Sequence, residues 1–307
     1  MIRLSRFIPT LLAPLALIAA VALTGCRMTS HVTSPGPAES AVTGNNDSRD
    51  TDELSSGSGN DDDAVLHQPS SGTPISGPTI ITKPGVYRLM NDIAADAKTG
   101  DGIVINSSDV VLWLGDHTLT GAGNKTGRGI VIENAEHVVV QGGRLQTFGI
   151  GVVLLEADRC VIRHLRIEGG DEFADPANGI APQIGMMLIN SATNRIARND
   201  ISGINLGVFV RGGGSYGNVI RRNEVSAMTH GLLGICYNPA PTGGNLGPSY
   251  DQVSENSLMR FRTGIQASKG SASNRFVRNS IGYFNEAWHD FNGSNQFLRN
   301  KTSLLAS

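Results

Sequence analysis

Three carboxylates lie within the five residues 171–175 of the segment GDEFADPANGIAPQI, which spans residues 170–184. Asp171, Glu172 and Asp175 could exchange protons with a substrate or bind calcium, because clustered carboxylates serve both purposes. Arg211 ends a short apolar run and is the cation best placed by type to bind an anionic group. His230, in the sequence His-Gly-Leu, is a further titratable candidate. We treat these five residues as the candidate catalytic residues.

Four arginines form a second group, because each is followed at once by asparagine. The phrases that contain them are NRIARNDI, NVIRRNEV, NRFVRNSI and NQFLRNKT, and the arginines are Arg198, Arg222, Arg278 and Arg299. In a related phrase Glu255 takes the place of the arginine. A column of this kind is either a solvated basic stripe or a contact line for an acidic polysaccharide or lipopolysaccharide. The residues alone leave both interpretations open.

A repeat must position these candidates. A Gly-apolar start recurs at Gly102, Gly129, Gly151, Gly185, Gly207, Gly231 and Gly264, with a degenerate copy at Ala287. The successive spacings of 27, 22, 34, 22, 24, 33 and 23 residues give a base period of about 22 with two long insertions, which indicates a solenoid. Short Val/Ile-rich runs alternate with turn residues, so each period predicts three short strands that stack in parallel at about 4.8 Å.

This pattern resembles the right-handed parallel β-helix of the pectate-lyase-like superfamily over about residues 100–305. The resemblance implies an all-β, single-stranded solenoid of about eight rungs. It also implies a ladder of stacked asparagines, formed here by Asn199, Asn223, Asn256, Asn279 and Asn300. We expect these residues to take the left-handed conformation of a tight bend and to hydrogen-bond from rung to rung. The fold hosts many chemistries, so it predicts architecture and not activity.

In the resembled superfamily, substrate lies along the outer face of the first strand, between loops from the flanking turns. Alternation predicts a mainly apolar outer face made by Val104, Asn106, Val131, Glu133, Val153, Leu155, Met187, Ile189, Phe209, Arg211, Leu233, Ile235, Gln266 and Ser268. The insertions 170–184 and 238–252 border this face from opposite sides. Either they cover the strip, since a bare apolar strip is costly on a monomer, or they wall a groove in which Phe209, Tyr237 and Tyr250 bind a ligand.

The catalytic motifs of the polygalacturonases and alginate epimerases are missing from the repeat region. It has no Asp-Asp pair and no Gly-His-Gly, and Asp175-Pro176 is not followed by His-Asp. Neither a cofactor nor a firm metal site is predicted, and calcium is expected only if the protein acts on uronides. The histidines fall on different rungs and do not form a relay.

The N-terminus predicts export. Arg3 and Arg6 precede an apolar run that ends in Leu-Thr-Gly-Cys, and this resembles the lipobox of bacterial lipoproteins. The resemblance implies cleavage of residues 1–25, a lipid such as palmitate on Cys26 and a membrane anchor, and Arg27 after the cysteine favours the outer membrane. Residues 26–75 read as a disordered acidic Ser/Gly/Pro tether, and residues 76–307 as the β-helix, with 76–100 as its N-terminal cap.

The remaining sequence features limit the kinds of partner that the protein can have. Residues 185–307 carry 12 Lys and Arg against 6 Asp and Glu, which favours an anionic partner, whereas scarce aromatic residues argue against nucleic acid. Cys160 and Cys236 lie about three rungs apart, too far for a disulfide, and are expected to be buried thiols. No obvious cap follows the last rung, so self-association through that end is a further option.

The sequence therefore favours an envelope-anchored lipoprotein that binds a polysaccharide or another envelope component in a non-catalytic role. The alternative is a polysaccharide lyase, hydrolase or epimerase that acts in a groove over the first-strand face. The membrane is expected to be contacted only through the N-terminal lipid.

Overall fold

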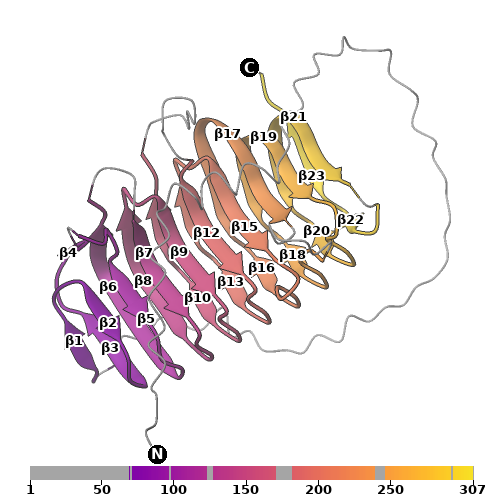
Figure 1. Cartoon of the computed structure of the whole chain (residues 1–307). Helices are drawn as coiled ribbons and strands as arrows, with labels where there is room; N and C mark the ends of the chain where they lie inside the picture. The colour runs from indigo at the N-terminus through magenta and orange to yellow at the C-terminus, as the bar shows by residue number, and fades with distance from the viewer. Residues whose placement is uncertain are drawn as a thin grey trace, which may run out of the picture.

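The computed structural model describes residues 69, 71–96, 98–122, 127–170, 182–238, 246–291 and 293–306, and for residues 229 and 230 the backbone alone. In these residues the regular structure is entirely β-strand, and no helix long and apolar enough to span a membrane is found among them. The strands pair in parallel and wind into a β-solenoid, in which successive coils lie side by side (Figure 1).

Three parallel sheets make the walls of the solenoid. The first sheet contains β2 (Thr79–Ile81), β5 (Ile103–Ile105), β7 (Arg128–Glu133), β9 (Ile150–Leu155), β12 (Ile184–Ile189), β15 (Leu206–Arg211) and the C-terminal parts of β17 (Glu224–Asn238), β19 (Ser257–Ala267) and β21 (Ser280–Asp290). We name each coil by its strand in this sheet.

The second sheet follows the first within each coil. It contains β1 (Thr73–Ile75), β3 (Gly85–Leu89), the starts of β6 (Val110–Thr120) and β8 (Val139–Gln146), β10 (Val161–Arg163), β13 (Arg195–Ala197), β16 (Val219–Arg221), β18 (Gln252–Ser254), β20 (Arg275–Val277) and β22 (Gln296–Leu298).

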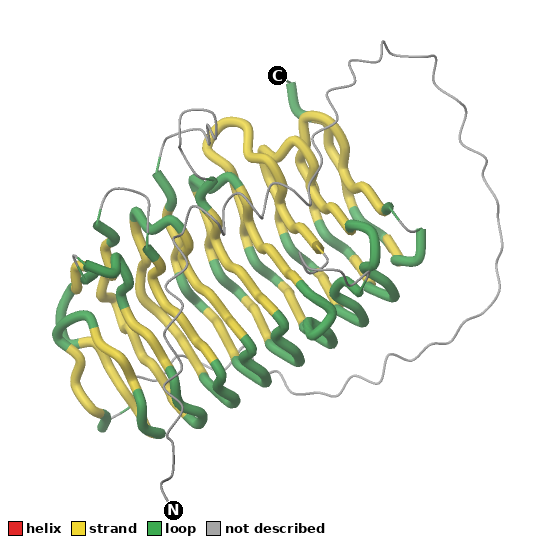
Figure 2. Tube along the Cα trace, in the orientation of Figure 1, coloured by secondary structure: helices red, strands yellow, loops and turns green. Residues whose placement is uncertain are grey.

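The third sheet closes each coil. It contains β4 (Ile93–Ala94), the ends of β6 and β8, β11 (Arg166–Glu168), β14 (Asp200–Ser202), the starts of β17, β19 and β21, and β23 (Lys301–Leu304). The turn from the first to the second sheet is the first corner, the next is the second corner, and the turn back to the first sheet is the third corner. The turns of successive coils align in rows (Figure 2).

The interior is filled by every second residue of each strand, because side chains alternate across a sheet. In the first sheet the inward residues form columns of aliphatic side chains, and Ile105, Ile132 and Leu154 are each 0% exposed. Burying one such side chain stabilises the fold by about 1.5–3 kcal/mol. The β-branched runs of the sequence are therefore the stacked core of the solenoid.

The recurring glycine is explained by close approach of neighbouring coils. A Cβ at Gly207 would collide with the carbonyl oxygen of Gly234, and the same holds down the column. The glycines in it are Gly102, Gly129, Gly151, Gly185, Gly207, Gly234 and Gly264. The predicted start at Gly231 is thus wrong by three residues, because a bulge between Ser226 and Gly231 lengthens the third corner of that coil.

The segment that the sequence marks as an N-terminal cap continues the solenoid. Its strand β2 pairs with β5 in the first sheet, and β3 pairs with β6 in the second. Strand β1 then lies on β3, outside the coil that these strands form. The segment therefore covers the coil of β5 as a further coil with the same register.

Candidate functional site

Two asparagine ladders hold the corners on either side of the second sheet. At the second corner, the Asn199 backbone N–H and side-chain amide donate to Asn223 Oδ1 at 3.0 and 2.9 Å, and Asn223 donates to Asn256 in the same way. The ladder continues through Asn279 to Asn300. The predicted rung-to-rung hydrogen bonding is confirmed.

The first corner has a ladder of its own, which the sequence analysis missed. It runs through Asn194, Asn218, Asp251, Asn274 and Asn295. The signal was present, because each phrase such as NRIARN carries two asparagines five residues apart. These two residues bracket one three-residue strand of the second sheet.

The bend conformation belongs to the residue before the second-corner asparagine and not to the asparagine itself. Arg198, Arg222 and Arg278 have φ of 55°, 54° and 54°. The asparagines are not among the residues of positive φ at that corner, so the expectation that they supply the left-handed conformation is wrong. The physical reason is that the asparagine side chain must point inward to reach the next coil, which leaves the bend to its neighbour.

The second corner therefore presents a column of charged side chains. In coil order it is His164, Arg198, Arg222, Glu255, Arg278 and Arg299. Glu255 accepts a hydrogen bond of 2.7 Å from Arg222 Nε and lies 4.0 Å from Arg278 Nη1. The hydrogen bond from Arg222 lowers the pKa of Glu255, so this carboxylate stays ionised between two cations. We call these six residues the corner column.

More basic residues flank the corner column on the outer faces of the second and third sheets. Arg163 donates to Gln141 at 2.9 Å, and Arg166 lies 3.3 Å from Asp200. Across the coils from β9 to β21 the flanking basic residues are Arg163, Arg166, Arg195, Arg221, Arg275 and Lys301, and the flanking acids are Glu168, Asp200 and Glu224. Basic side chains outnumber acidic ones along this edge of the solenoid.

The outer face of the first sheet carries a buried apolar strip. Val131, Val153, Met187, Phe209 and Cys236 are each between 0% and 4% exposed and pack together. The predicted ligand-binding residue Phe209 is one of them, at 1% exposed, so it is a packing residue of this strip. Cys236 is a buried thiol as expected; Cys160, also buried, lies in the interior, where burial raises its pKa to about 11.

The register of β17 overturns the expected outward position of Ile235 but not that of Leu233. Ile235 and Tyr237 pair with Val208 and Val210 and belong to the interior. Tyr237 is 0% exposed and packs edge-on against Phe276, so it is not a groove residue. The outward residues of this strand are Leu233, which packs in the apolar strip as expected, Cys236 and Asn238, because the glycine column is shifted by three positions.

A buried carboxyl lies where the first-corner ladder would have asparagine. Asp251 is 1% exposed and accepts hydrogen bonds from the Asn218 backbone N–H at 2.7 Å and side-chain amide at 3.2 Å. Burial raises the pKa of Asp251 to about 7. The Tyr237 hydroxyl lies beside this carboxyl, although no hydrogen bond of ordinary length joins them. Asp251 faces the interior and cannot reach a ligand on the outer face.

A polar group adjoins the apolar strip at the first-corner end of the first sheet. Arg211 and Asn238 occupy matching positions on adjacent coils and are 7% and 1% exposed. Ser268 follows on the next coil with Gln266 beside it, 3.5 Å from its hydroxyl. The Asn238 side-chain Nδ2 is buried and has no hydrogen-bond partner among the described residues. This group could bind a hydroxyl or carboxylate of a ligand, but none of its four side chains is suited to act as a general acid or general base.

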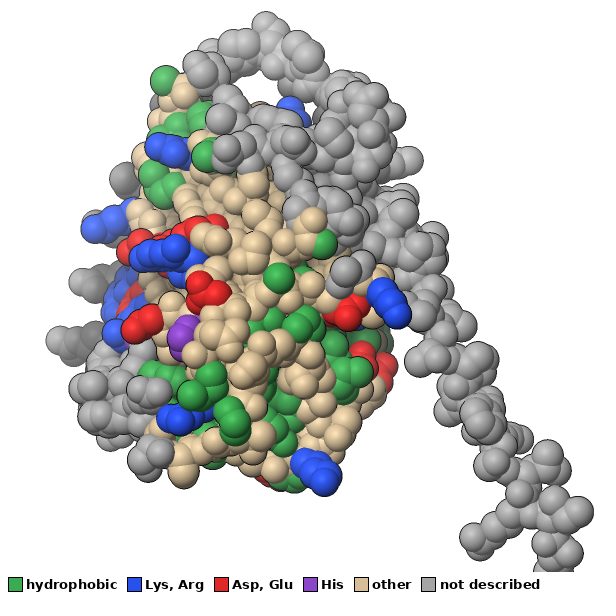
Figure 3. All heavy atoms as spheres, turned by 90° about the vertical axis from the view of Figure 1, so that its left-hand side faces the viewer, with side chains coloured by type: hydrophobic (Ala, Val, Ile, Leu, Met, Phe, Trp, Pro, Cys, Tyr) green, Lys and Arg blue, Asp and Glu red, His purple; other side chains and the backbone are tan. Residues whose placement is uncertain are grey.

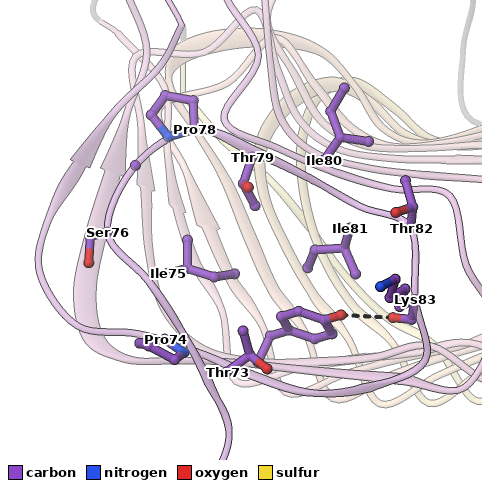
Figure 4. Close-up of a pocket in the computed structure, with 12 residues that line it drawn as sticks. Thr73, Pro74, Ile75, Ser76, Pro78, Thr79, Ile80, Ile81, Thr82 and Lys83 are labelled. Carbon is purple, nitrogen blue, oxygen red and sulfur yellow. Dashed lines mark hydrogen bonds between the residues drawn. The ribbon is translucent and has the colours of Figure 1, made fainter.

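A pocket lies elsewhere, away from both corners and from the apolar strip. It has a volume of about 280 Å³ at the end of the solenoid that carries β1, and is lined by β1, β2 and the residues between them (Figure 4). Tyr87 donates to the Lys83 carbonyl oxygen at 2.9 Å there, and no carboxylate or histidine lines it. Hydrophobic side chains reach the surface at this end (Figure 3). We interpret this pocket as the open end of the solenoid.

Several predicted residues lie outside the described part of the chain. These are Cys26, Asp171, Glu172 and Asp175, and the side chain of His230. Of the remaining candidates, Arg198, Arg222, Arg278 and Arg299 are brought together in the corner column. Tyr250 is 72% exposed on the first corner, away from the interior. No group of three His, Cys, Asp or Glu side chains that could hold a metal ion occurs in the residues described.

The family model described as "Right handed beta helix region" matches residues 100–281. No curated protein matches the sequence at a significant level.

Solved structures with a similar fold include DFA-IIIase from Arthrobacter chlorophenolicus, with 16% identity and a TM-score of 0.49 over 70% of this chain and 55% of that one. The Dettilon tailspike protein has 15% identity and a TM-score of 0.47, over 74% of this chain and 51% of that one. A mutant of the periplasmic alginate epimerase AlgG has 11% identity and a TM-score of 0.45, over 69% and 55%. The chain spans about half the length of these proteins, and the likeness concerns the fold alone.

Proposed function

The chain belongs to the right-handed β-helix family, and from its corner column we propose that it binds an acidic polysaccharide without cleaving it. The observation that carries this proposal is the residue type at the second corner. A residue with φ near 55° is left-handed, which costs a residue with a Cβ about 1–2 kcal/mol and favours Gly or Asn. Arginine occupies four of the six positions, although the backbone gives no reason to prefer it.

The column also keeps like charges close together. Neighbouring corner residues on adjacent coils are separated by about 4.8 Å, at which two unit charges in water repel by about 1 kcal/mol. Glu255 relieves part of this repulsion, because it lies between Arg222 and Arg278. A polymer with regularly spaced carboxylates that lies along the solenoid axis would further reduce the repulsion among the four arginines, and this charge complementarity supports the proposal.

The proposal is tested by retention of the purified full chain on an immobilised polyuronate at low salt. Arg198→Gln with Arg222→Gln should weaken binding by roughly 5- to 30-fold, from about 1–2 kcal/mol for two charge contacts at the surface. Arg159→Gln with Arg260→Gln is the matched control, because both residues are exposed and have positive φ at other corners. An equal loss of retention in both double variants would mean that net charge alone causes binding, which would contradict a role of the corner column. Unchanged retention of the Arg198→Gln, Arg222→Gln variant would also contradict the proposal.

A second candidate is catalysis over the first-sheet face. The observation that favours it is the Asn238 amide beside Arg211, which has no hydrogen-bond partner within the described part of the chain. Asp171, Glu172 or Asp175 would have to supply the acid and base, with calcium as a ligand-bridging ion if the substrate is a uronide. A panel of polysaccharides incubated with wild type and with Asp175→Ala and Arg211→Ala tests this. Cleavage or epimerisation that both variants retain would refute the assignment.

We further infer that the protein acts at a bacterial cell envelope, held by a lipid on Cys26, with the outer membrane as the expected location. The supporting observation is the Leu-Thr-Gly-Cys sequence directly after an apolar run. The β-helix would then bind glycan within reach of the tether 26–75.

A further inference from the structure

Two tyrosines of the first corner are exposed on adjacent coils. Tyr216 is 51% exposed and Tyr250 is 72% exposed. Tyr216 pairs with Ser249, so Gly217 lies level with Tyr250 on the neighbouring coil. The two rings therefore start one coil and one residue apart, with about 4.8 Å between them along the axis.

The backbone under both tyrosines is fixed. The Tyr216 carbonyl oxygen accepts from Thr193 N–H at 2.9 Å, and the Tyr250 N–H donates to the Ala272 carbonyl oxygen at 3.3 Å. Beneath this corner runs the ladder of Asn218, Asp251 and Asn274. The rings thus project from a rigid support, which lowers the entropy lost when they bind a ligand.

Tyr250 is in a backbone conformation that a bulky residue seldom takes. Its φ is 58°, and the equivalent residues on other coils are polar or small: Asp109, His137, Arg159, Thr193, Gly217 and Ser273. The conformation costs about 1 kcal/mol or more. Because the side chain is largely exposed, packing does not offset this cost. Fold stability therefore does not explain a tyrosine here.

Neighbouring side chains leave the Tyr250 ring uncovered. Gly217 flanks it on one coil and Ser273 on the other. Neither Tyr216 nor Tyr250 has a ring contact or a side-chain hydrogen bond with any residue in the described part of the chain. Two aromatic faces on a fixed support, with the Ser249 and Ser273 hydroxyls beside them, suit a ligand with one apolar face and a polar rim.

We propose that Tyr216 and Tyr250 form a subsite that stacks on the C–H face of a pyranose ring of a glycan. An aromatic ring is negative on its face, so it attracts the polarised C–H groups of a sugar, while the sugar hydroxyls bond to serine hydroxyls and water. This subsite rests on the proposed function only in taking a glycan as its ligand. It lies on the first corner, separated from the corner column by the second sheet, and it does not depend on charge.

The test is affinity electrophoresis of the full chain in gels that contain a neutral α-glucan, a neutral β-glucan or a galactomannan, at high salt to screen the arginines. At least one gel should retard the wild type, and Tyr216→Ala or Tyr250→Ala should weaken the binding about ten-fold. Phe291→Ala is the matched control, because Phe291 is 52% exposed on a different coil. No retardation of the wild type by any gel would overturn the proposal, and so would an equal loss in the control.

Tyr250→Gly separates binding from folding. Glycine relieves the positive φ, so this variant should melt at the same or a higher temperature than the wild type and still lose the retardation. Tyr250→Phe should keep it. Retained binding in Tyr250→Gly would overturn the proposal. The Arg198→Gln, Arg222→Gln variant should keep retardation by neutral glycan at high salt, so failure of the corner column and failure of the tyrosine subsite give different results.

Discussion

Replacing Asp251 with asparagine should abolish a loss of stability that the wild type suffers as pH rises. In the wild type, burial raises the pKa of this carboxyl from 3.8 to about 7, so the fold favours the neutral acid. Its contribution is fully present below pH 3.8, and it is lost as pH rises through about 7. A pKa raised from 3.8 to about 7 corresponds to ~4 kcal/mol of unfolding free energy, because a tenfold change in proton affinity is about 1.36 kcal/mol.

The asparagine fits the ladder on both sides. Asp251 already accepts from Asn218, as an asparagine oxygen would. On the other side, Asn218 and Asn274 each donate a side-chain N–H to the next residue of their ladder, so an amide at position 251 can donate to Asn274 Oδ1. Asp251→Asn should therefore be more stable than wild type at pH 8, by up to ~4 kcal/mol, and much closer to it at pH 4.

Urea unfolding of both proteins at several pH values measures this, and the difference between them cancels the titration of all other groups. Hydrogen exchange of the Asn218 amide, which donates to Asp251 at 2.7 Å, gives a local reading of the same effect. Tyr237→Phe should extend the loss of stability of the wild type to higher pH, because the hydroxyl beside the carboxyl lowers its pKa. A stability difference between Asp251→Asn and wild type that is the same at pH 4 and pH 8 would refute the reasoning.

Three further outcomes are expected. Asn223→Ala should destabilise the fold by roughly 2–4 kcal/mol in urea unfolding, because it removes the acceptor of two buried Asn199 N–H groups and the side-chain donor to the Ile196 carbonyl oxygen and to Asn256 Oδ1. Asn300→Ala, at the last coil and only partly buried, should cost less; equal costs would contradict the ladder. Gly207→Ala should reduce folded yield through collision with a carbonyl oxygen, and Gly77→Ala, with open space around it, should not. Cys26→Ser should move the protein from the membrane fraction to the soluble fraction, and an unchanged membrane fraction would contradict lipid anchoring.

The architecture was predictable because its causes are local and repeated. The Gly-apolar starts mark a column where coils approach too closely for a Cβ, and the alternating Val and Ile residues mark the interior. The predicted register of the glycine column is wrong only where the third corner of one coil is longer, between Ser226 and Gly231. Alternation of inward and outward residues along the strand cannot reveal such a bulge. For this reason the sequence places Tyr237 on the outer face, whereas its side chain lies in the interior.

The candidate sites were less predictable, because a sequence pattern does not say which residue of an Arg-Asn pair bends the chain. Asparagine has the higher preference for positive φ, so it was assigned the bend, but the ladder takes its side chain inward and leaves the bend to arginine. Tyr216 gave no repeat signal at all, since no other coil has an aromatic residue there. Its exposure becomes visible only when the corners are aligned in space.

At the second corner one residue forms the ladder and its neighbour takes the bend, and this affects how the surface can vary in sequence. The asparagine holds the turn from inside, so the adjacent outward position tolerates His, Arg or Glu on different coils with φ between 53° and 58°. Each coil thus offers one interchangeable position at a constant pitch, and a substitution there alters the surface without altering the backbone. If the column binds a polymer as proposed, such an array would also measure repeat length: a polymer whose repeat differs from the rise per coil would drift out of step after a few coils, so pitch would select ligands together with charge.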